Sequence, residues 1–467
     1  MIPKFPKRTY EYHGTTNPDF VNRIEARCPG CSPGNTAGDE GEAVVLSPTY
    51  YQSSINERVI GTSMLTEDRY AVVTIEEVGY QWRIHLFSIN DDYTVTELDM
   101  VEFNVNLGGV ASPPLTDLDG YLASMCTLGD SYVVLVYHKL ITGTGGMSGV
   151  YAMLAPVDLT TGTITAPTGY QTLATYYGQN AVPFVAKVSD TEFILVAQLT
   201  EGTGYAITTF MVTLTGTTFS TVSVDTQASP SVDWGLKDST RTSGGIKMCY
   251  NPFFDLWYGR LVGMETKPSS PTYPQTWGTV GFAMTNAGYL DISGTLATTE
   301  EITSAFDGVE STTHDYGIAH TPSTGATIIR EYNNTTIDAS AQINTVAHDT
   351  YTFSTQGLDT LEGSTEAGYF YPACVYLSTE TKDRIVMFYG IQRASTPSRA
   401  DYWMAEFDPP SMSLRKVSQM GLEGEPYYGT RMAKNFPDVL VGRTWIAPYA
   451  ITSPRAGRFI SGTVRLV

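Results

Sequence analysis

The chain has 467 residues and a strongly acidic balance, with 28 Lys and Arg against 48 Asp and Glu and a formal net charge of −20. That excess of acid argues against a protein that grips nucleic acid, because such binding depends on clustered Lys and Arg. Hydrophobic residues make up 42% and charged residues 16% of the chain, which is enough apolar material for a large core. No run reaches the roughly 18 apolar residues of a membrane helix, and no apolar core follows the basic start at residues 1–8, so we expect neither membrane insertion nor a secretory signal.

Residues 1–41 are expected to form an extended N-terminal arm. They contain five prolines and a Gly-rich end at 33–41, so they cannot bury a core of their own. Two interpretations stay open: a disordered tail, or a docking arm that lies along a neighbouring subunit and is anchored by its aromatic residues. Those aromatic residues are Phe5, Tyr10, Tyr12 and Phe20.

The five cysteines are an odd number and do not indicate a disulfide framework. Cys28 and Cys31 have the spacing of a zinc knuckle, but a structural zinc site needs four ligands and His13 is the only nearby imidazole. We therefore expect a simple turn and no metal or other cofactor; half-sites from two subunits are the way in which zinc would bind. The other three cysteines are expected in the core, on the innermost strands of their repeats: Cys126, Cys249 and Cys374.

From residue 42 onward one pattern recurs seven times: strand, short polar turn, strand, loop, strand, short polar turn, strand. The interval is about sixty residues, and such a period indicates units that must stack on their neighbours to bury their apolar faces. The sequence therefore predicts an all-β fold, a seven-bladed β-propeller of four-stranded blades. The first turns are at 66–68, 128–130, 188–190, 251–253, 322–324, 378–380 and 436–438, and the second turns at 90–92, 160–162, 215–217, 286–288, 348–350 and 408–410.

The runs between these turns are rich in β-branched and aromatic residues, which is typical of strands. The fifth unit is the weakest, with short or polar runs at 327–329 and 337–343. Second strands are expected at 70–75, 132–137, 193–197, 257–263 and 385–389, and third strands at 84–89, 210–214, 282–284 and 403–407.

The last repeat ends inside its third strand, at 458–466, so its fourth strand must come from elsewhere. The apolar run at 42–46 is the natural candidate, and closing the ring with it would remove an exposed sheet edge. The predicted organisation is an arm at 1–41 and a propeller at 42–467. Its blades are expected at about 53–110, 111–170, 171–228, 229–300, 301–358, 359–420, and 421–467 together with 42–52.

In a four-stranded blade the short turns lie on one face of the disc, and here the opposite face receives the long loops. These loops carry tyrosines and tryptophans beside carboxylates, a combination that suits sugar rings, whose C–H faces stack on aromatic rings. Tyrosine is also enriched at protein interfaces of every kind, so contact with a protein partner stays open. The expected glycan or partner contacts are Tyr80, Trp82, Tyr205, Trp234, Tyr273, Tyr316, Tyr371 and Tyr427.

A propeller glycosidase needs two carboxyl groups about 5 to 10 Å apart at the mouth of its channel. Nothing in the sequence singles out such a pair, and the Asp-box of sialidases, the WD40 marks, G-x-S-x-G and H-E-x-x-H are absent. We therefore expect no catalytic residue and a protein that is not an enzyme; the alternative is a secreted or surface carbohydrate-active propeller. The carboxylates to test for that alternative are Asp117, Asp233, Asp307 and Glu425.

The runs SDTEFILVA at 189–197 and FMVTLTGTTF at 210–219 resemble the degenerate propeller repeats of tailed-bacteriophage virion proteins and of some bacterial surface proteins. As a pattern the resemblance covers residues 42–467. It implies a virion structural protein of the tail or capsid, made in the host cytoplasm, whose partners are other virion proteins, further copies of itself in an oligomer, and a host receptor or surface glycan. No catalytic residue carries over, and a bacterial binding or scaffolding propeller is the remaining alternative.

Overall fold

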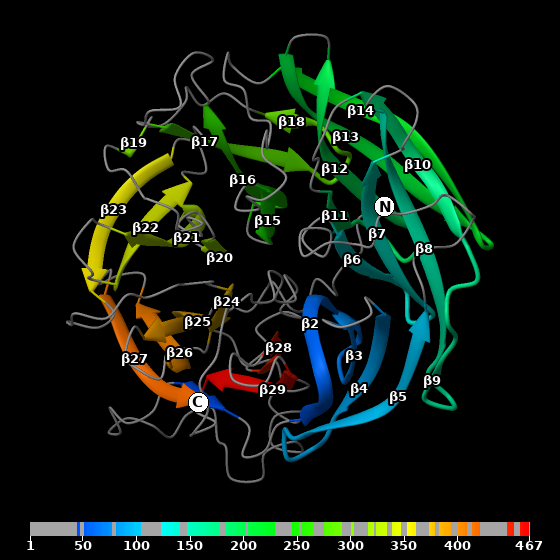
Figure 1. The fold of residues 1–467 in the computed structure, drawn as a ribbon, viewed down its shortest axis with the longest axis horizontal. Coiled ribbons are helices and arrows are strands. Elements are labelled where there is room, and N and C mark those ends of the chain that lie inside the picture. The colour runs from blue at the N-terminus through cyan, green and yellow to red at the C-terminus, as the bar shows by residue number, and fades with distance from the viewer. Residues whose placement is uncertain are drawn as a thin grey trace.

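The computed structural model is all-β in the residues that it describes, with strands grouped into antiparallel sheets that stand around a common centre (Figure 1). Small sheets set radially in a ring are the architecture of a β-propeller, as the repeat predicts. The described part of the chain contains no helix long and apolar enough to cross a membrane. The structure describes residues 44–46, 51–76, 81–103, 123–140, 147–177, 183–201, 204–228, 245–251, 254–265, 275–291, 300–302, 316–321, 324–333, 339–346, 353–360, 373–378, 383–393, 399–408, 413–420, 446–452 and 458–466.

Six groups of antiparallel strands follow one another in chain order. The first contains β2 (Tyr51–Thr66), β3 (Arg69–Glu76), β4 (Trp82–Ile89) and β5 (Val95–Phe103); the second β6 (Ala123–Leu128), β7 (Tyr132–Leu140), β8 (Met147–Asp158) and β10 (Tyr170–Tyr177), with β9 (Thr163–Ile164) beside β8. The third contains β11 (Phe184–Lys187), β12 (Glu192–Glu201), β13 (Gly204–Thr215) and β14 (Thr218–Ala228); the fourth β15 (Gly245–Asn251), β16 (Leu256–Glu265), β17 (Gln275–Thr285) and β18 (Leu290–Asp291), with β19 (Glu300–Ile302) also on β17. The fifth contains β20 (Tyr316–Thr321), β21 (Thr324–Asn333), β22 (Ala339–Val346) and β23 (Phe353–Thr360), and the sixth β24 (Ala373–Ser378), β25 (Asp383–Arg393), β26 (Arg399–Asp408) and β27 (Ser413–Met420).

The predicted second and third strands are confirmed. Every second-strand run lies within β3, β7, β12, β16 or β25, and every third-strand run within β4, β13, β17 or β26. The weak fifth unit also forms a regular sheet, in which β21 and β22 pair over eight residues. Strands therefore pair there in spite of a polar sequence.

The first strand of each group contacts the first strand of the next, in the order β2, β6, β11, β15, β20 and β24. The remaining strands, β28 (Ile446–Thr452) and β29 (Arg458–Leu466), contact both β24 and β2, so the ring closes. This order favours seven blades. The count stays a prediction, because the first strand of the last blade, with its turn at 436–438, falls outside the described residues, as does the arm at 1–41.

Closure of the ring by the N-terminal strand is confirmed. β1 (Val44–Leu46) pairs antiparallel with the end of β29, with Val44 opposite Leu466 and Leu46 opposite Val464. The first residues of β2 continue along β29, and β2 then crosses into the first sheet, where it pairs with β3. One continuous segment thus joins the last sheet to the first.

Two matching hydrogen bonds show that β29 occupies the place of a third strand, as predicted. The Thr463 hydroxyl on β29 donates at 2.6 Å to the carbonyl of Tyr93, in the second turn of the first group. The Thr209 hydroxyl on the third strand β13 donates at 2.6 Å to the carbonyl of Gly288, in the second turn of the fourth group. Tyr93 and Gly288 occupy the same point of their turns, and both have a left-handed backbone. β1 therefore takes the place of a fourth strand.

The turns carry the conformations that their sequences indicate. Positive φ angles, which glycine adopts without steric cost, occur at one predicted first turn and at three predicted second turns. These glycines are Gly129, Gly162, Gly216 and Gly288.

The core lies between the sheets, because alternate residues of one strand face opposite neighbours. On β3, Ala71 and Val73 pack toward the second group, whereas Tyr70 and Val72 pack toward β29. Each fully buried large apolar side chain contributes about 1.5–3 kcal/mol. Stacking of neighbouring sheets is therefore what stabilises each unit.

Candidate functional site, a charged cluster at the ring closure

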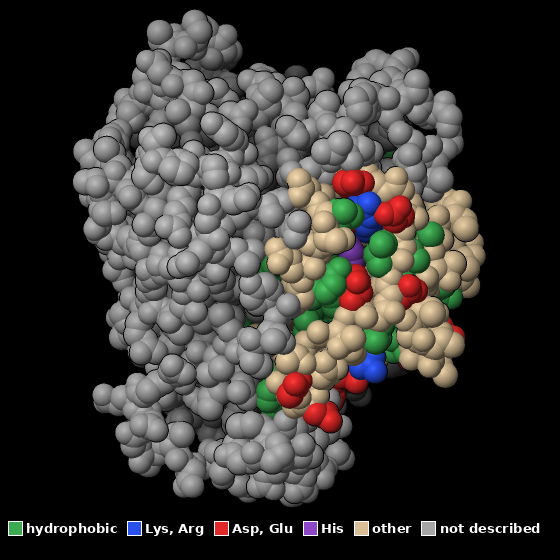
Figure 2. All heavy atoms as spheres, turned by 60° about the horizontal axis from the view of Figure 1, so that its bottom comes forward, with side chains coloured by type: hydrophobic (Ala, Val, Ile, Leu, Met, Phe, Trp, Pro, Cys, Tyr) green, Lys and Arg blue, Asp and Glu red, His purple; other side chains and the backbone are tan. Residues whose placement is uncertain are grey.

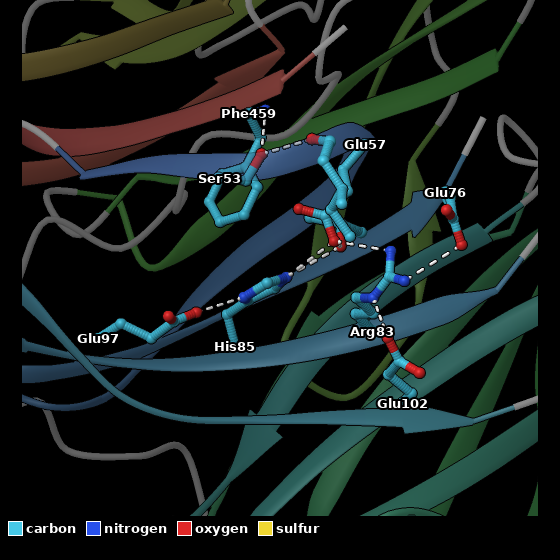
Figure 3. A network of polar contacts seen from close by, with 10 residues as sticks. Ser53, Glu57, Glu76, Arg83, His85, Glu97, Glu102 and Phe459 are labelled. Atoms are coloured by element: carbon cyan, nitrogen blue, oxygen red, sulfur yellow. Dashed lines mark hydrogen bonds and ion pairs between the residues drawn. The ribbon is translucent and has the colours of Figure 1, made fainter. Parts of the chain in front are cut away.

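A buried group of charged side chains lies where β2 leaves the last sheet and enters the first (Figure 3). Its centre is Glu57 on β2, which has no solvent exposure. Arg83 and His85 reach it from β4, where their alternate positions place both on the same face of the sheet; they are 5% and 2% exposed. The carboxylates that complete the cluster are Glu76 on β3 and Glu97 and Glu102 on β5.

Arg83 contacts three carboxylates at once. Its Nη1 donates to Glu57 at 3.1 Å, its Nη2 to Glu76 at 3.1 Å and its Nε to Glu102 at 2.7 Å. A guanidinium is planar, permanently charged and carries five N–H donors, which suits it to such a position. Arg83 therefore neutralises the buried Glu57 and links β2, β3 and β5 to β4.

His85 lies between two carboxylates. Its Nδ1 is 2.6 Å from Oε1 of Glu97, and its Nε2 is 3.4 Å from Oε1 of Glu57. The Thr74 hydroxyl lies 3.2 Å from the same Nε2 and 3.3 Å from the same Glu57 oxygen. A neutral imidazole has one N–H, whereas an imidazolium has two. Donation to both carboxylates therefore requires the charged form of His85.

The cluster keeps its charges although it is buried. Burial by itself lowers the pKa of His85, but hydrogen bonds to Glu57 and Glu97 and their charges outweigh it and raise that pKa above its usual value. Burial raises the pKa of Glu57, yet His85 and Arg83 hold it below its usual value. Within the described residues Oε2 of Glu57 has no hydrogen-bond partner. Four carboxylates face two cationic side chains, so negative charge is in excess even when His85 is protonated.

Aromatic side chains join the cluster to the closing strands. Tyr51, on the part of β2 that pairs with β29, has its ring centroid 5.0 Å from that of Phe87 and 5.2 Å from that of Phe459. The His85 ring meets Phe459 edge-on at 4.6 Å. The Ser53 hydroxyl accepts a hydrogen bond from the backbone N–H of Phe459 at 3.1 Å. The start of β2, the first sheet and β29 therefore share one packed contact.

The surroundings of Glu57 do not suit it to act as an acid catalyst on a sugar. A glycosidase acid is a carboxyl whose pKa is raised, whereas the pKa of Glu57 is lowered and its side chain is sealed from solvent. Figure 2 shows acidic and basic side chains gathered around a histidine on one face of the described strands. The three partly exposed carboxylates of the cluster, Glu76, Glu102 and Glu97, are paired with Arg83 or His85.

The expectation for Trp82 is wrong. The sequence predicts it on the long-loop face, but it begins β4, is 1% exposed and packs in the core between the first and second groups, with its ring centroid 6.4 Å from that of Phe103. Position 82 shares a strand face with Ile84 and Leu86, and that face is buried against the second group. A ring in this position cannot stack on a sugar.

The other expected residues have mixed placements. Tyr205 lies on β13 opposite Thr200, and Tyr316 on β20 opposite Arg330.

Cys126 on β6 and Cys249 on β15 are buried, which confirms the core prediction for both. The described residues contain no group of three or more His, Cys, Asp or Glu that could hold a metal ion. The residues outside the described part, whose roles stay predictions, are Cys28, Cys31, Tyr80, Asp117, Trp234, Asp233, Tyr273, Asp307, Tyr371, Glu425 and Tyr427.

Reasoning from the sequence missed the charged cluster, although a signal was present. Arg83 and His85 alternate with Trp82 and Ile84 in a strand of the ring. A strand stacked between two neighbours buries both faces, so polar residues at alternate positions must find partners there.

No protein-family model matches the chain, and no curated protein matches it. Among solved structures, the propeller of a subtype N11 neuraminidase-like protein from a flat-faced bat virus is 12% identical, with a TM-score of 0.36, over 79% of this chain and 90% of that one. An α-L-arabinofuranosidase from Fusarium graminearum is 11% identical, with a TM-score of 0.40, over 80% and 99%. The WD40 domain of SCAP from fission yeast is 9% identical, with a TM-score of 0.36, over 91% and 98%. Likeness at this level carries no argument about activity or partner, and the propeller fold is shown by the strands and their order around the ring.

Proposed function

We propose that this protein is a propeller that acts by contact and not by catalysis. More specifically, we propose that it is a structural component of a bacteriophage virion. Its N-terminal arm tethers it, and its long-loop face binds other partners. The observation that carries the proposal is the position of β1, whose residues Val44–Leu46 are paired into the ring. A partner that binds the arm, residues 1–41, is thereby connected to a strand that is hydrogen-bonded into the propeller. A force on the arm would act directly on the propeller.

The ion pairs of the buried charged cluster support a contact role. Glu57, the most buried carboxylate of the cluster, has a lowered pKa and serves in ion pairs that hold the closure. The pKa values of Glu57, Asp92 and Asp158 are all shifted downward, which is the opposite of what a general acid needs. Rigid scaffolds that carry long loops are also the usual support of binding surfaces.

The arm can be tested apart from the fold. Deleting residues 1–38 leaves β1 in place, so we expect an unchanged melting temperature and the loss of higher oligomers in light scattering of the purified protein. Mass spectrometry of purified virus particles tests the virion part of the proposal directly. Oligomers that persist at full strength without the arm would contradict its docking role.

The alternative function, a glycosidase-like enzyme, is tested by turnover. The similar propellers include an α-L-arabinofuranosidase, so arabinan is a reasonable first polysaccharide for a reducing-sugar assay. We expect no release of sugar by the isolated protein. Cleavage that is lost when one of Asp117, Asp233, Asp307 or Glu425 becomes the amide would replace the contact proposal by the enzyme.

A further inference from the structure

We propose that His85 is a proton-operated latch on the ring closure, which holds the N-terminal segment 44–56 more tightly when the imidazole carries two protons than when it carries one. The inference does not depend on what the propeller binds. It follows from the positions of two carboxylates and one hydroxyl around the ring nitrogens.

The geometry provides a hydrogen-bond pattern for each protonation state. In the charged state Nδ1–H donates to Glu97, Nε2–H donates to Glu57, and the Thr74 hydroxyl also donates to Glu57. In the neutral state the shorter contact, 2.6 Å to Glu97, keeps the remaining proton on Nδ1, and Nε2 becomes an acceptor. The Thr74 hydroxyl, 3.2 Å from Nε2, then turns to donate to that nitrogen. Loss of one proton thus removes two donors from Glu57.

Glu57 has few means of compensation. Its side chain has no solvent exposure, and its Oε2 has no partner among the described residues, so its stabilisation comes through Oε1. After His85 loses its proton, the donor left to that oxygen is Nη1 of Arg83. An ionised carboxylate that loses partners in the interior is strongly destabilising.

The position of Glu57 couples this loss to the closure. Asn56, the residue before it, is paired with Arg458 of β29, whereas Glu57 is paired with Glu76 of β3. Glu57 therefore stands at the point where the N-terminal segment changes sheets. Weakening its contacts loosens the end of the segment that closes the ring.

Tyr51 and Arg83, which also lie near His85, keep their charge state between about pH 6 and about pH 9. Burial, followed by the charge of Glu97, raises the pKa of Tyr51, which stays a neutral phenol, and Arg83 stays charged. From β29 the described neighbour is the uncharged Phe459. Burial lowers the pKa of His320, a second buried histidine, to about 3, so that residue stays neutral throughout.

The sign of the pH effect follows from these directions. The pKa of His85 is raised above 6.5 in the folded protein, so its stabilisation is complete below pH 6.5 and is lost as the pH rises through the raised value. The pKa of Glu57 is lowered below 4.5, so its contribution is complete above pH 4.5 and is lost as the pH falls through the lowered value. The closure is tightest between these two transitions.

The test is hydrogen exchange of the full-length protein, read by mass spectrometry on peptides from 44–56 and corrected for intrinsic exchange, from about pH 6 to about pH 9. We expect the opening constant of this segment to rise by up to about tenfold per pH unit, because one proton is released on opening. His85→Gln, which cannot titrate, should open readily at every pH and lose the slope. Peptides from β13 serve as the internal control and should show no such slope.

Two further variants keep the test decisive if His85→Gln does not fold. Glu97→Gln weakens the contact to Nδ1 and should move the transition to lower pH, whereas Thr74→Val removes the donor that serves the neutral ring and should move it to higher pH. Thr74→Ser, the matched control, should behave like the wild type. A slope that survives in His85→Gln, or exchange of 44–56 that is independent of pH in the wild type, would overturn the latch.

Discussion

Replacing Arg83 by Met should destabilise the ring more than any other single change in the charged cluster. Methionine keeps an unbranched apolar side chain but removes the cation that contacts three carboxylates. Glu57 then stays buried, with His85 as its one remaining cationic neighbour. Removing one partner of a buried ion pair costs about 3–5 kcal/mol. We expect the lower part of that range at pH 6, where His85 is charged.

Glu57→Gln should cost less, because Arg83 retains Glu76 and Glu102 and the glutamine oxygen can still accept its hydrogen bond. Those two carboxylates are 27% and 48% exposed, so water helps to satisfy them as well. We expect a loss of about 1.5–3 kcal/mol, the scale of a hydrogen bond to a charged group. The double variant should lose less than the sum of the single variants, because no uncompensated charge is left in the interior.

Urea unfolding at pH 6, followed by tryptophan fluorescence, gives the free energy of unfolding of each variant. Arg69→Met is a matched control, because Arg69 pairs with Asp68 at 2.7 Å on the surface, where both side chains are 29–43% exposed. An exposed pair of this kind is worth at most about 1 kcal/mol. Equal losses for the two arginine variants, or strict additivity in the double variant, would refute the argument from buried charge.

Two further predictions concern the closure and the core. Deleting residues 1–48 removes β1 and should lower the melting temperature sharply, because several hydrogen bonds between β1 and β29, each worth about 1 kcal/mol, are lost together. Deleting residues 1–38 should hardly change the melting temperature. Equal melting temperatures for the two truncated proteins would contradict the closure. Trp82→Ala should lower the free energy of urea unfolding by about 3–5 kcal/mol. Trp82→Phe should lower it much less, because Phe keeps most of the ring and removes an Nε1–H that has no partner among the described residues. A Trp82→Ala protein as stable as the wild type would argue against a core position for Trp82.

The fold could be predicted from the sequence because its signals are local. Turns such as 160–162, 215–217 and 286–288 each contain a glycine with positive φ, and the runs between turns are long enough to be strands. The closing strand is predictable as well, because 42–46 is an apolar run that belongs to none of the first six repeats. The turns and the closing strand can both be recognised from short stretches of sequence, without knowing how the strands align with one another.

The cluster could not be predicted in the same way, because it depends on register between strands. Glu57 and Arg83 meet only when β2, β3 and β4 pair in one particular alignment. Trp82 was misplaced for a related reason. The strand begins at Trp82, two residues earlier than the predicted run, and in a strand that step decides between a loop residue and a buried one.

The closing strand β1 (Val44–Leu46) directly follows the arm, so the proposed docking of the arm and the proposed His85 latch act on one equilibrium. If protonation of His85 stabilises the closing segment 44–56, then anything that holds this segment in place must favour protonation of His85, because such coupling is reciprocal. A partner that docks the arm so as to tighten β1 should therefore raise the pKa of His85, and one that pulls β1 off β29 should lower it. An NMR titration of labelled histidines, with residues 1–38 either free or tethered to a bead, measures that shift. A pKa of His85 that stays the same under both conditions would show that the arm and the closure act independently.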